Sequence, residues 1–190
     1  MMLDPAGWEA LRLSLLVGVT ATVLALPFAI WVAWLLARRE FWGKSALNAA
    51  VQLPLVLPPV VTGYRLMVRA LRLAIEAVDP KLEQAARTRG APGWAGFRTV
   101  TLPLILPGIL AGGVMGFAKA IGEFGATITF VANIPGETQT LPSAIYALLQ
   151  VPGGEDAAIR LVLWACVLAL GAVVLSEWLA RRVAARIAGT

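Results

Sequence analysis

The sequence predicts an all-α protein that crosses a membrane several times as a bundle of helices. Apolar residues make up 59% of the chain and charged residues 14%, and the mean hydropathy is +0.79. Soluble domains carry fewer apolar and more charged residues. Uncharged runs near the ~20 residues that span a hydrocarbon core occur at Leu13–Ala37, Ala46–Tyr64, Thr99–Ala118 and Leu161–Ser176. We therefore expect one transmembrane domain over residues 1–190 with about four crossings.

The first expected span, residues 12–37, is typical of an anchor that stays in the protein. Asp4 and Glu9 precede it, whereas a secretory signal peptide begins with a basic region and has a shorter apolar core. The second span, residues 46–64, is poorly suited to a straight helix. It contains Pro54, Pro58 and Pro59, which remove backbone donors and clash with preceding carbonyls. We expect this span to be kinked or incomplete.

The basic residues gather in three places, which the positive-inside rule assigns to the cytoplasm. They are Arg38, Arg39 and Lys44, then seven Lys/Arg from Arg65 to Arg98, and then Arg181, Arg182 and Arg186. The linker 132–156 has acidic and no basic residues, so we place it outside, between spans at 100–131 and 157–180. Only one apolar run lies between Lys44 and Arg65, although a return to the same side needs two crossings. A crossing is therefore missing there.

The composition argues against an enzyme, a metal site or a nucleic-acid binder. The chain has no histidine, which removes the commonest zinc ligand and the usual general base. Its one cysteine, Cys166, lies within an apolar run and cannot form an internal disulfide. Basic loops beside spans are what topology alone requires. We expect no catalytic residues, no bound metal and no nucleic acid.

Residues 65–99 predict a cytoplasmic region that carries a short exposed helix. Charged residues from Arg65 to Arg87 recur at steps of three and four, which forms one polar stripe on a helix that lies on or emerges from the bilayer. Asp79 and Pro80 form a good N-cap and first position, and Gly90 suits the left-handed residue after a helix. A second helix is expected from Pro80 to Arg89. An inert amphipathic surface helix would have the same pattern.

A motif follows this cap: Gln84-Ala85-Ala86, three residues, Gly90, nine residues, then Val100-x-Leu102-Pro103. It resembles the EAA motif of ABC importer permeases, which docks into a cytoplasmic ATPase. The resemblance implies an ATPase-coupling set of Glu83, Gln84, Ala85, Ala86, Gly90, Val100, Leu102 and Pro103. The small alanines allow close approach to a partner, and Gly90 lets the chain turn away sharply. Gln84 stands where the family usually has Glu, so one carboxylate of the family's motif is absent.

A closer resemblance covers most of the chain. The segments 53–63, 67–70, 122–130, 133–140 and 176–181 are similar to those of the molybdate ABC transporter permease subunit; they include Gly122-Glu-Phe-Gly-Ala-Thr-Ile-Thr-Phe130 and Asn133-Ile-Pro-Gly-Glu-Thr-Gln-Thr140. Relative to that family, sequence is missing between Tyr64 and Arg65. This gap coincides with the missing crossing, and it indicates an internally shortened chain.

The span 100–131 carries two further patterns. Gly108, Gly112 and Gly116 recur every four residues and predict a groove for a closely packed helix. Lys119, Glu123 and Thr127 continue at the same step, so Lys119 and Glu123 can form an ion pair that faces the bundle. A structural ion pair is the simpler interpretation. Alternatively, Lys119, Glu123, Thr127 and Thr129 line a pathway for a divalent oxyanion.

The resemblance implies a permease subunit of the bacterial cytoplasmic membrane, surrounded by lipid, that pairs with itself. It also implies a cytoplasmic ATPase partner, which uses ATP and Mg, and an extracytoplasmic binding protein that delivers molybdate. The chain itself is expected to bind no cofactor. Tungstate and sulfate remain open as alternative substrates, because tetrahedral oxyanions differ little in size. A second hypothesis is a shortened, transport-incompetent interaction protein that retains the docking helix.

Overall fold

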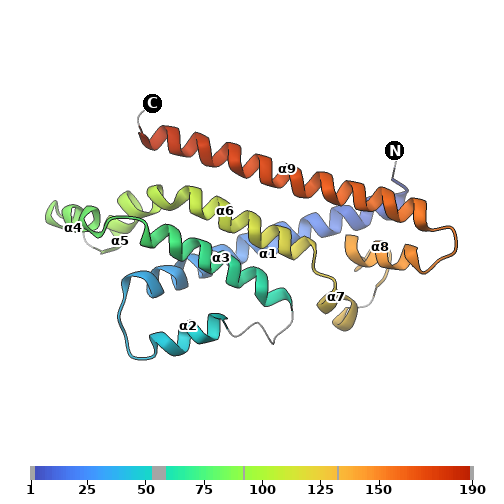
Figure 1. Ribbon diagram of the computed structural model, residues 1–190, viewed down its shortest axis with the longest axis horizontal. Coiled ribbons are helices and arrows are strands. Elements are labelled where there is room, and N and C mark those ends of the chain that lie inside the picture. Colours follow the sequence, from blue (N-terminus) through green and yellow to red (C-terminus); the bar gives the residue numbers. More distant parts are fainter. Residues whose placement is uncertain (1–2, 53–58, 92, 132, 189–190) are drawn as a thin grey trace.

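The structure is a computed structural model that describes residues 3–52, 59–91, 93–131 and 133–188, and every regular element within them is a helix. The all-α prediction is thereby confirmed. The elements in order are α1 (Pro5–Arg38), α2 (Lys44–Gln52), α3 (Pro59–Glu76), α4 (Pro80–Thr88), α5 (Gly93–Gly96), the π-helical turn η2 (Phe97–Thr101), α6 (Leu102–Ile121), α7 (Gly125–Phe130), α8 (Leu141–Leu149) and α9 (Glu155–Ala188). In Figure 1, α1, α3, α6 and α9 form an elongated bundle.

Within the described residues, three helical stretches are long and apolar enough to cross a membrane, rather than the four expected. They are Pro5–Arg38, Gly93–Ile121 and Glu155–Val183. Within the expected span 46–64, the structure describes α2, which ends at Gln52, and α3, which begins at Pro59. Pro54 and Pro58 lie outside the described residues. Pro59 fits the start of α3, where its missing N–H costs nothing.

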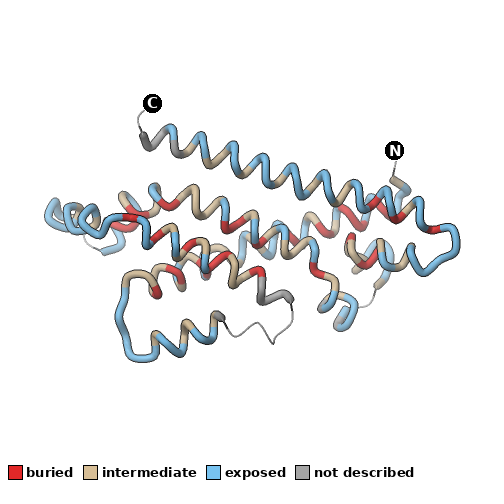
Figure 2. Tube along the Cα trace, in the orientation of Figure 1, coloured by how far each residue is buried: buried red, intermediate tan, exposed pale blue. Residues whose placement is uncertain are grey.

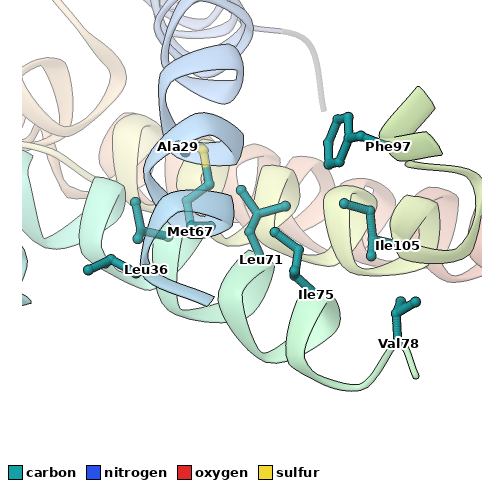
Figure 3. Close-up of a cluster of buried hydrophobic side chains, with 10 residues drawn as sticks. Ala29, Leu36, Met67, Leu71, Ile75, Val78, Phe97 and Ile105 are labelled. Carbon is teal, nitrogen blue, oxygen red and sulfur yellow. The ribbon is translucent and has the colours of Figure 1, made fainter. Parts of the chain in front are cut away.

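Residues 65–76 were expected to form a helix that lies on or emerges from the bilayer. In the structure they belong to α3, which continues without interruption through Tyr64 and Arg65 to Glu76. One face of α3 packs against α1 and α6, and its Met67, Leu71 and Ile75 are at most 2% exposed. Figure 3 places these side chains among Ala29 and Leu36 of α1, Phe97 and Ile105. The polar stripe therefore lies on one side of a bundle helix.

The helices α3 and α6 pack antiparallel through the three glycines of α6. A Cβ added at Gly108 would overlap the Cβ of Ala74, and one at Gly116 would overlap the methyl group of Met67. At Gly112 it would lie 3.4 Å from the Met67 carbonyl oxygen. The structure thus places the predicted groove against α3, where small residues let the two backbones approach.

The expected span 100–131 also has different bounds. Helical backbone begins at Gly93 and continues through η2 into α6, which ends at Ile121. Gly122 caps α6 by donating to the carbonyls of Ala118 and Ala120, and the short helix α7 follows separately. The expected spans 12–37 and 157–180 lie within α1 and α9.

The two ends of the bundle differ in charge. The C-terminal ends of α1 and α3, together with α4 and the start of α6, form what we call the basic end (Figure 1). The start of α1, α7, α8 and the start of α9 lie at the opposite end (Figure 1), where the Ser14 hydroxyl accepts from the Leu141 amide at 2.7 Å. Figure 2 shows that α9 is exposed over most of its length, as expected for a helix that faces lipid.

Candidate functional sites: an exposed helix and a central cavity

The helix α4 forms as the sequence predicts, and it projects from the basic end of the bundle. The Asp79 carboxylate accepts from the Lys81 amide at 2.9 Å, which caps the first turn. Gly90 follows the helix with φ +85°, a left-handed conformation that favours glycine. None of the residues of α4 is buried. A nine-residue helix that buries no side chain of its own is held in place by its attachments.

The main polar attachment of α4 is the carboxylate of Glu83. Its Oε1 accepts from Arg38 Nε at 3.1 Å and from Thr101 Oγ1 at 2.8 Å. A second nitrogen of Arg38 donates to the Val78 carbonyl at 2.8 Å. The Glu83 and Arg38 side chains are only 17% and 13% exposed, and Thr101 is fully buried. We call Glu83, Arg38 and Thr101 the α4 latch, because they connect α4 to the end of α1 and the start of α6.

The predicted coupling residues therefore divide into two groups. Gln84, Ala85 and Gly90 are exposed on α4 and its exit turn. Glu83 points inward in the latch, and Ala86 is half-buried near Gly96. The remaining three, Val100, Leu102 and Pro103, lie in η2 and the first turn of α6. They form the joint between α4 and the long helix behind it.

A cavity of about 430 Å³ lies between α1, α3, α6 and α7. We call it the central cavity. The predicted pathway residues Lys119, Glu123 and Thr127 line it, and Thr129 does not. Thr129 is exposed, and its hydroxyl donates to the Gly125 carbonyl at 2.7 Å. Because α6 ends at Ile121, Lys119 lies in its last turn and Glu123 in the connection to α7, so the two residues are not four apart on one helix.

Other polar residues of the central cavity were not found by the sequence reasoning. Hydroxyl groups line it at Ser14, Thr22, Tyr64 and Thr140, which come from α1, α3 and the turn before α8. They are isolated in sequence, and a lone Ser or Thr in an apolar helix carries no pattern. Its usual contact is with its own backbone, as Thr22 Oγ1 shows by donating to the Gly18 carbonyl at 2.7 Å.

A second cavity, of about 350 Å³, lies between α2 and α3 and is lined by the polar stripe of α3. Arg65, Arg69 and Arg72 line it. Arg72 donates to Glu76 at 2.7 Å and to Asn48 of α2 at 3.1 Å. The stripe that suggested a bilayer-surface helix thus faces a neighbouring helix of the same chain.

A bundle of span-length helices with a latched, exposed helix at its basic end defines a polytopic membrane protein. The chain belongs to the binding-protein-dependent transport system inner membrane components, because that family's model matches residues 10–189. It is accordingly a multi-pass permease of the cytoplasmic membrane.

Several relatives have named functions. The molybdenum transport system permease proteins ModB of Escherichia coli K12 and Haemophilus influenzae are each 48% identical to this chain, over 221 and 214 positions. These matches cover 95% and 92% of this chain and 96% and 93% of the relatives. The molybdate/tungstate transport system permease protein WtpB of Thermococcus kodakarensis is 34% identical, over 94% of this chain and 81% of its own length. These relatives are transport permeases, which are not themselves enzymes.

The matches also reveal a difference in length. Since 95% of 190 residues is about 181, about 40 of the 221 positions matched to the E. coli protein lie opposite no residue of this chain. For the H. influenzae protein, 92% of 190 is about 175, which leaves about 39 of 214. The relatives thus carry about 40 additional positions within the matched region, roughly the length of two spans at ~20 residues each. A gap between Tyr64 and Arg65, as the resemblance implies, would be of this size.

Proposed function

We propose that this chain is the membrane subunit of an ABC importer that moves molybdate, or a similar tetrahedral oxyanion such as tungstate, across the cytoplasmic membrane. The named functions of its relatives support this substrate class. The structural observation that carries the proposal is an exposed helix, α4, joined by a partly buried ion pair to two long helices. Such a helix can transmit the movement of a cytoplasmic partner into the bundle.

In this mechanism the chemistry on ATP belongs to the partner. Two permease copies bind two ATPase subunits, which use ATP and Mg, and this chain binds no cofactor. Closure of the ATPases draws the two α4 helices together. The latch transfers that displacement to α1 and α6, because Glu83 is bonded to Arg38 and Thr101 at once. A binding protein outside would release the oxyanion when the bundle opens outward.

The central cavity is the proposed site of passage. A divalent oxyanion needs hydrogen-bond donors and moderate positive potential, and it must be able to leave again. Lys119 supplies the charge, and hydroxyl groups including that of Thr127 supply donors. Glu123, on the same wall, weakens net attraction for an anion. We infer that the cavity favours transit over tight binding.

The test is ATP-dependent uptake of labelled molybdate into vesicles that contain this chain, its ATPase and its binding protein. Uptake that requires all three components, and that tungstate inhibits more than sulfate does, supports the proposal. A cysteine introduced at the exposed Ala85, in a Cys166→Ser background, should cross-link to the ATPase. Failure of both uptake and cross-linking would overturn the proposal.

The missing length favours a second candidate function. With about 40 positions fewer than the relatives and three span-length helical stretches in its described part, the chain could hold the ATPase at the membrane without a complete pathway. The same experiment separates the two functions. Cross-linking of α4 without uptake would assign the chain as an interaction protein.

A further inference from the structure

A third cavity, of about 540 Å³, opens on the basic end beside α4. Four aromatic side chains line it: Trp31 and Trp34 of α1, Trp94 of α5 and Phe97 of η2. We call this cavity the aromatic groove. Trp94 stacks on Phe97 with ring centroids 5.4 Å apart, and Phe97 meets Trp34 edge-on at 6.3 Å. The volume is within the range of ~300 to 1,000 Å³ typical of small-molecule sites.

The groove is apolar along most of its length and open to its surroundings. Trp31 is 61% exposed and Trp94 73% exposed, and Pro27, Ile30 and Leu102 complete the apolar wall. Trp31 and Trp34 still belong to the apolar run of α1, eight and five residues before Arg39. They therefore lie at the depth where a membrane changes from hydrocarbon to headgroups, the usual position of tryptophan in spanning helices.

Two arginines stand at the polar end of the same groove. Arg39 lies over Trp34, with its guanidinium carbon 5.4 Å from the ring centroid, and Arg87 reaches the groove from α4. Arg38 differs, because it donates to Glu83 and Val78. A guanidinium stacked on an indole keeps its edge N–H groups available for a phosphate, which arginine can bind through two parallel hydrogen bonds.

We propose that the aromatic groove binds an anionic phospholipid, with an acyl chain along Trp31, Trp94 and Phe97 and the phosphate between Arg39 and Arg87. The groove combines an apolar wall at membrane depth with positive charge at headgroup level, which is the chemistry of such a lipid. A cytoplasmic protein would reach only the polar end. Because Arg39 follows α1 and Arg87 belongs to α4, the bound headgroup would bridge the bundle and the exposed helix.

The test uses the full chain purified in detergent and titrated with phosphatidylglycerol or phosphatidylcholine of identical acyl chains, with occupancy measured by native mass spectrometry. We expect phosphatidylglycerol to bind about tenfold more tightly, since its phosphate carries an uncompensated charge. The double variant Arg39→Gln/Arg87→Gln should lose this preference and leave phosphatidylcholine binding unchanged. Both arginines are exposed, so the fold should tolerate their replacement.

The matched control is Arg181→Gln/Arg182→Gln, which removes the same charge from α9. Arg182 also lies over a tryptophan, 4.0 Å from the Trp178 ring centroid, but neither control residue lines the groove. The control should keep the preference for phosphatidylglycerol, and Trp94→Ala should weaken binding of both lipids. Equal binding of the two lipids would overturn the proposal. So would an equal loss in the control, displacement of the lipid by inorganic phosphate, or a second copy of the chain found cross-linked in the groove.

Discussion

Glu83 is the residue through which α4 is attached to the bundle, and its role differs from the one its sequence position indicates. In the motif it stands beside the exposed Gln84 and Ala85, where a carboxylate would be expected to meet the ATPase. In the structure it accepts from Arg38, 45 residues earlier, and from Thr101, 18 residues later. Local spacing carries no information about contacts over such separations, so neither partner could have been predicted. What the sequence did predict was the helix, because its capping residues are local.

The first prediction concerns this latch. Glu83→Ala leaves the half-buried Arg38 without its carboxylate and Thr101 without its acceptor, and it should destabilise the protein by about 1–3 kcal/mol. Thr101→Val removes one hydrogen bond at constant shape and should cost about 1 kcal/mol. The measurement is thermal unfolding of detergent-purified protein.

Glu177→Ala is the matched control for the latch. Glu177 accepts from Arg181 at 2.9 Å, but both side chains are more than 60% exposed. An exposed pair contributes only about 0–1 kcal/mol. If Glu83→Ala and Glu177→Ala lowered the unfolding temperature equally, the latch would not be what holds α4.

The second prediction asks whether Gly90 is required for its backbone conformation or for the lack of a side chain. Nothing lies within 4 Å of a Cβ added there, but the backbone has φ +85°. Gly90→Val should cost about 1–2 kcal/mol because a left-handed conformation is strained for a branched side chain, and it should misdirect the exit of α4. Gly90→Asn adds a side chain that tolerates this conformation.

Co-purification of a tagged ATPase is the readout for these Gly90 variants. We expect Gly90→Asn to retain the ATPase and Gly90→Val to lose it, with membrane insertion unchanged in both. If the asparagine variant lost the ATPase as well, contact with the partner, rather than backbone conformation, would set the requirement for glycine.

At the scale of the elements, the packing of α3 on α6 ranks Gly108, Gly112 and Gly116 by how much an added methyl group should cost. The residue opposite Gly108 is Ala74, whose Cβ has no freedom to move away from a new methyl group. Gly116 faces the end of the flexible Met67 side chain, and a methyl group at Gly112 would make only ordinary contacts at 3.4 to 3.6 Å. The four-residue repeat predicted close packing but neither the partner helix nor this ranking, since both depend on what lies opposite.

The third prediction follows from that ranking. Gly108→Ala should destabilise the bundle by about 1–3 kcal/mol through overpacking, whereas Gly112→Ala and Gly116→Ala should cost little. Ala74→Gly should rescue Gly108→Ala, because it removes the opposing methyl group. Gly171→Ala on α9, where nothing lies within 4 Å, is the control and should be neutral or stabilise the helix by up to about 1 kcal/mol. Thermal unfolding of the set is decisive: equal costs at all three positions, or no rescue, would contradict the packing of α3 on α6.

For the molecule as a whole, hydropathy and the three basic groups predicted the membrane bundle and the common location of its basic ends. They did not predict the path between α1 and α4. Both α1 and α3 end beside α4, since Arg38 at the end of α1 donates to Val78 just after α3. The two helices therefore run in the same direction, although residues 65–72 looked cytoplasmic because they carry Arg65, Arg69 and Arg72. A charge-counting rule cannot recognise a basic stripe that faces a neighbouring helix.

The last prediction tests this path with single cysteines in a Cys166→Ser background. Trp42→Cys lies just after α1, Arg89→Cys just after α4, and Glu137→Cys between α7 and α8; all three positions are exposed. A membrane-impermeant maleimide should label the first two only in inside-out vesicles and the third only in right-side-out vesicles. The reason is geometric: α1 and α3 both end beside α4, so an even number of crossings must separate positions 42 and 89. The helix α2 has nine residues, far fewer than the ~20 needed to span a bilayer. Labelling of positions 42 and 89 from opposite sides would show that α1 and α3 do not end on the same side of the membrane. The shortened chain would then have a different topology from the bundle described above.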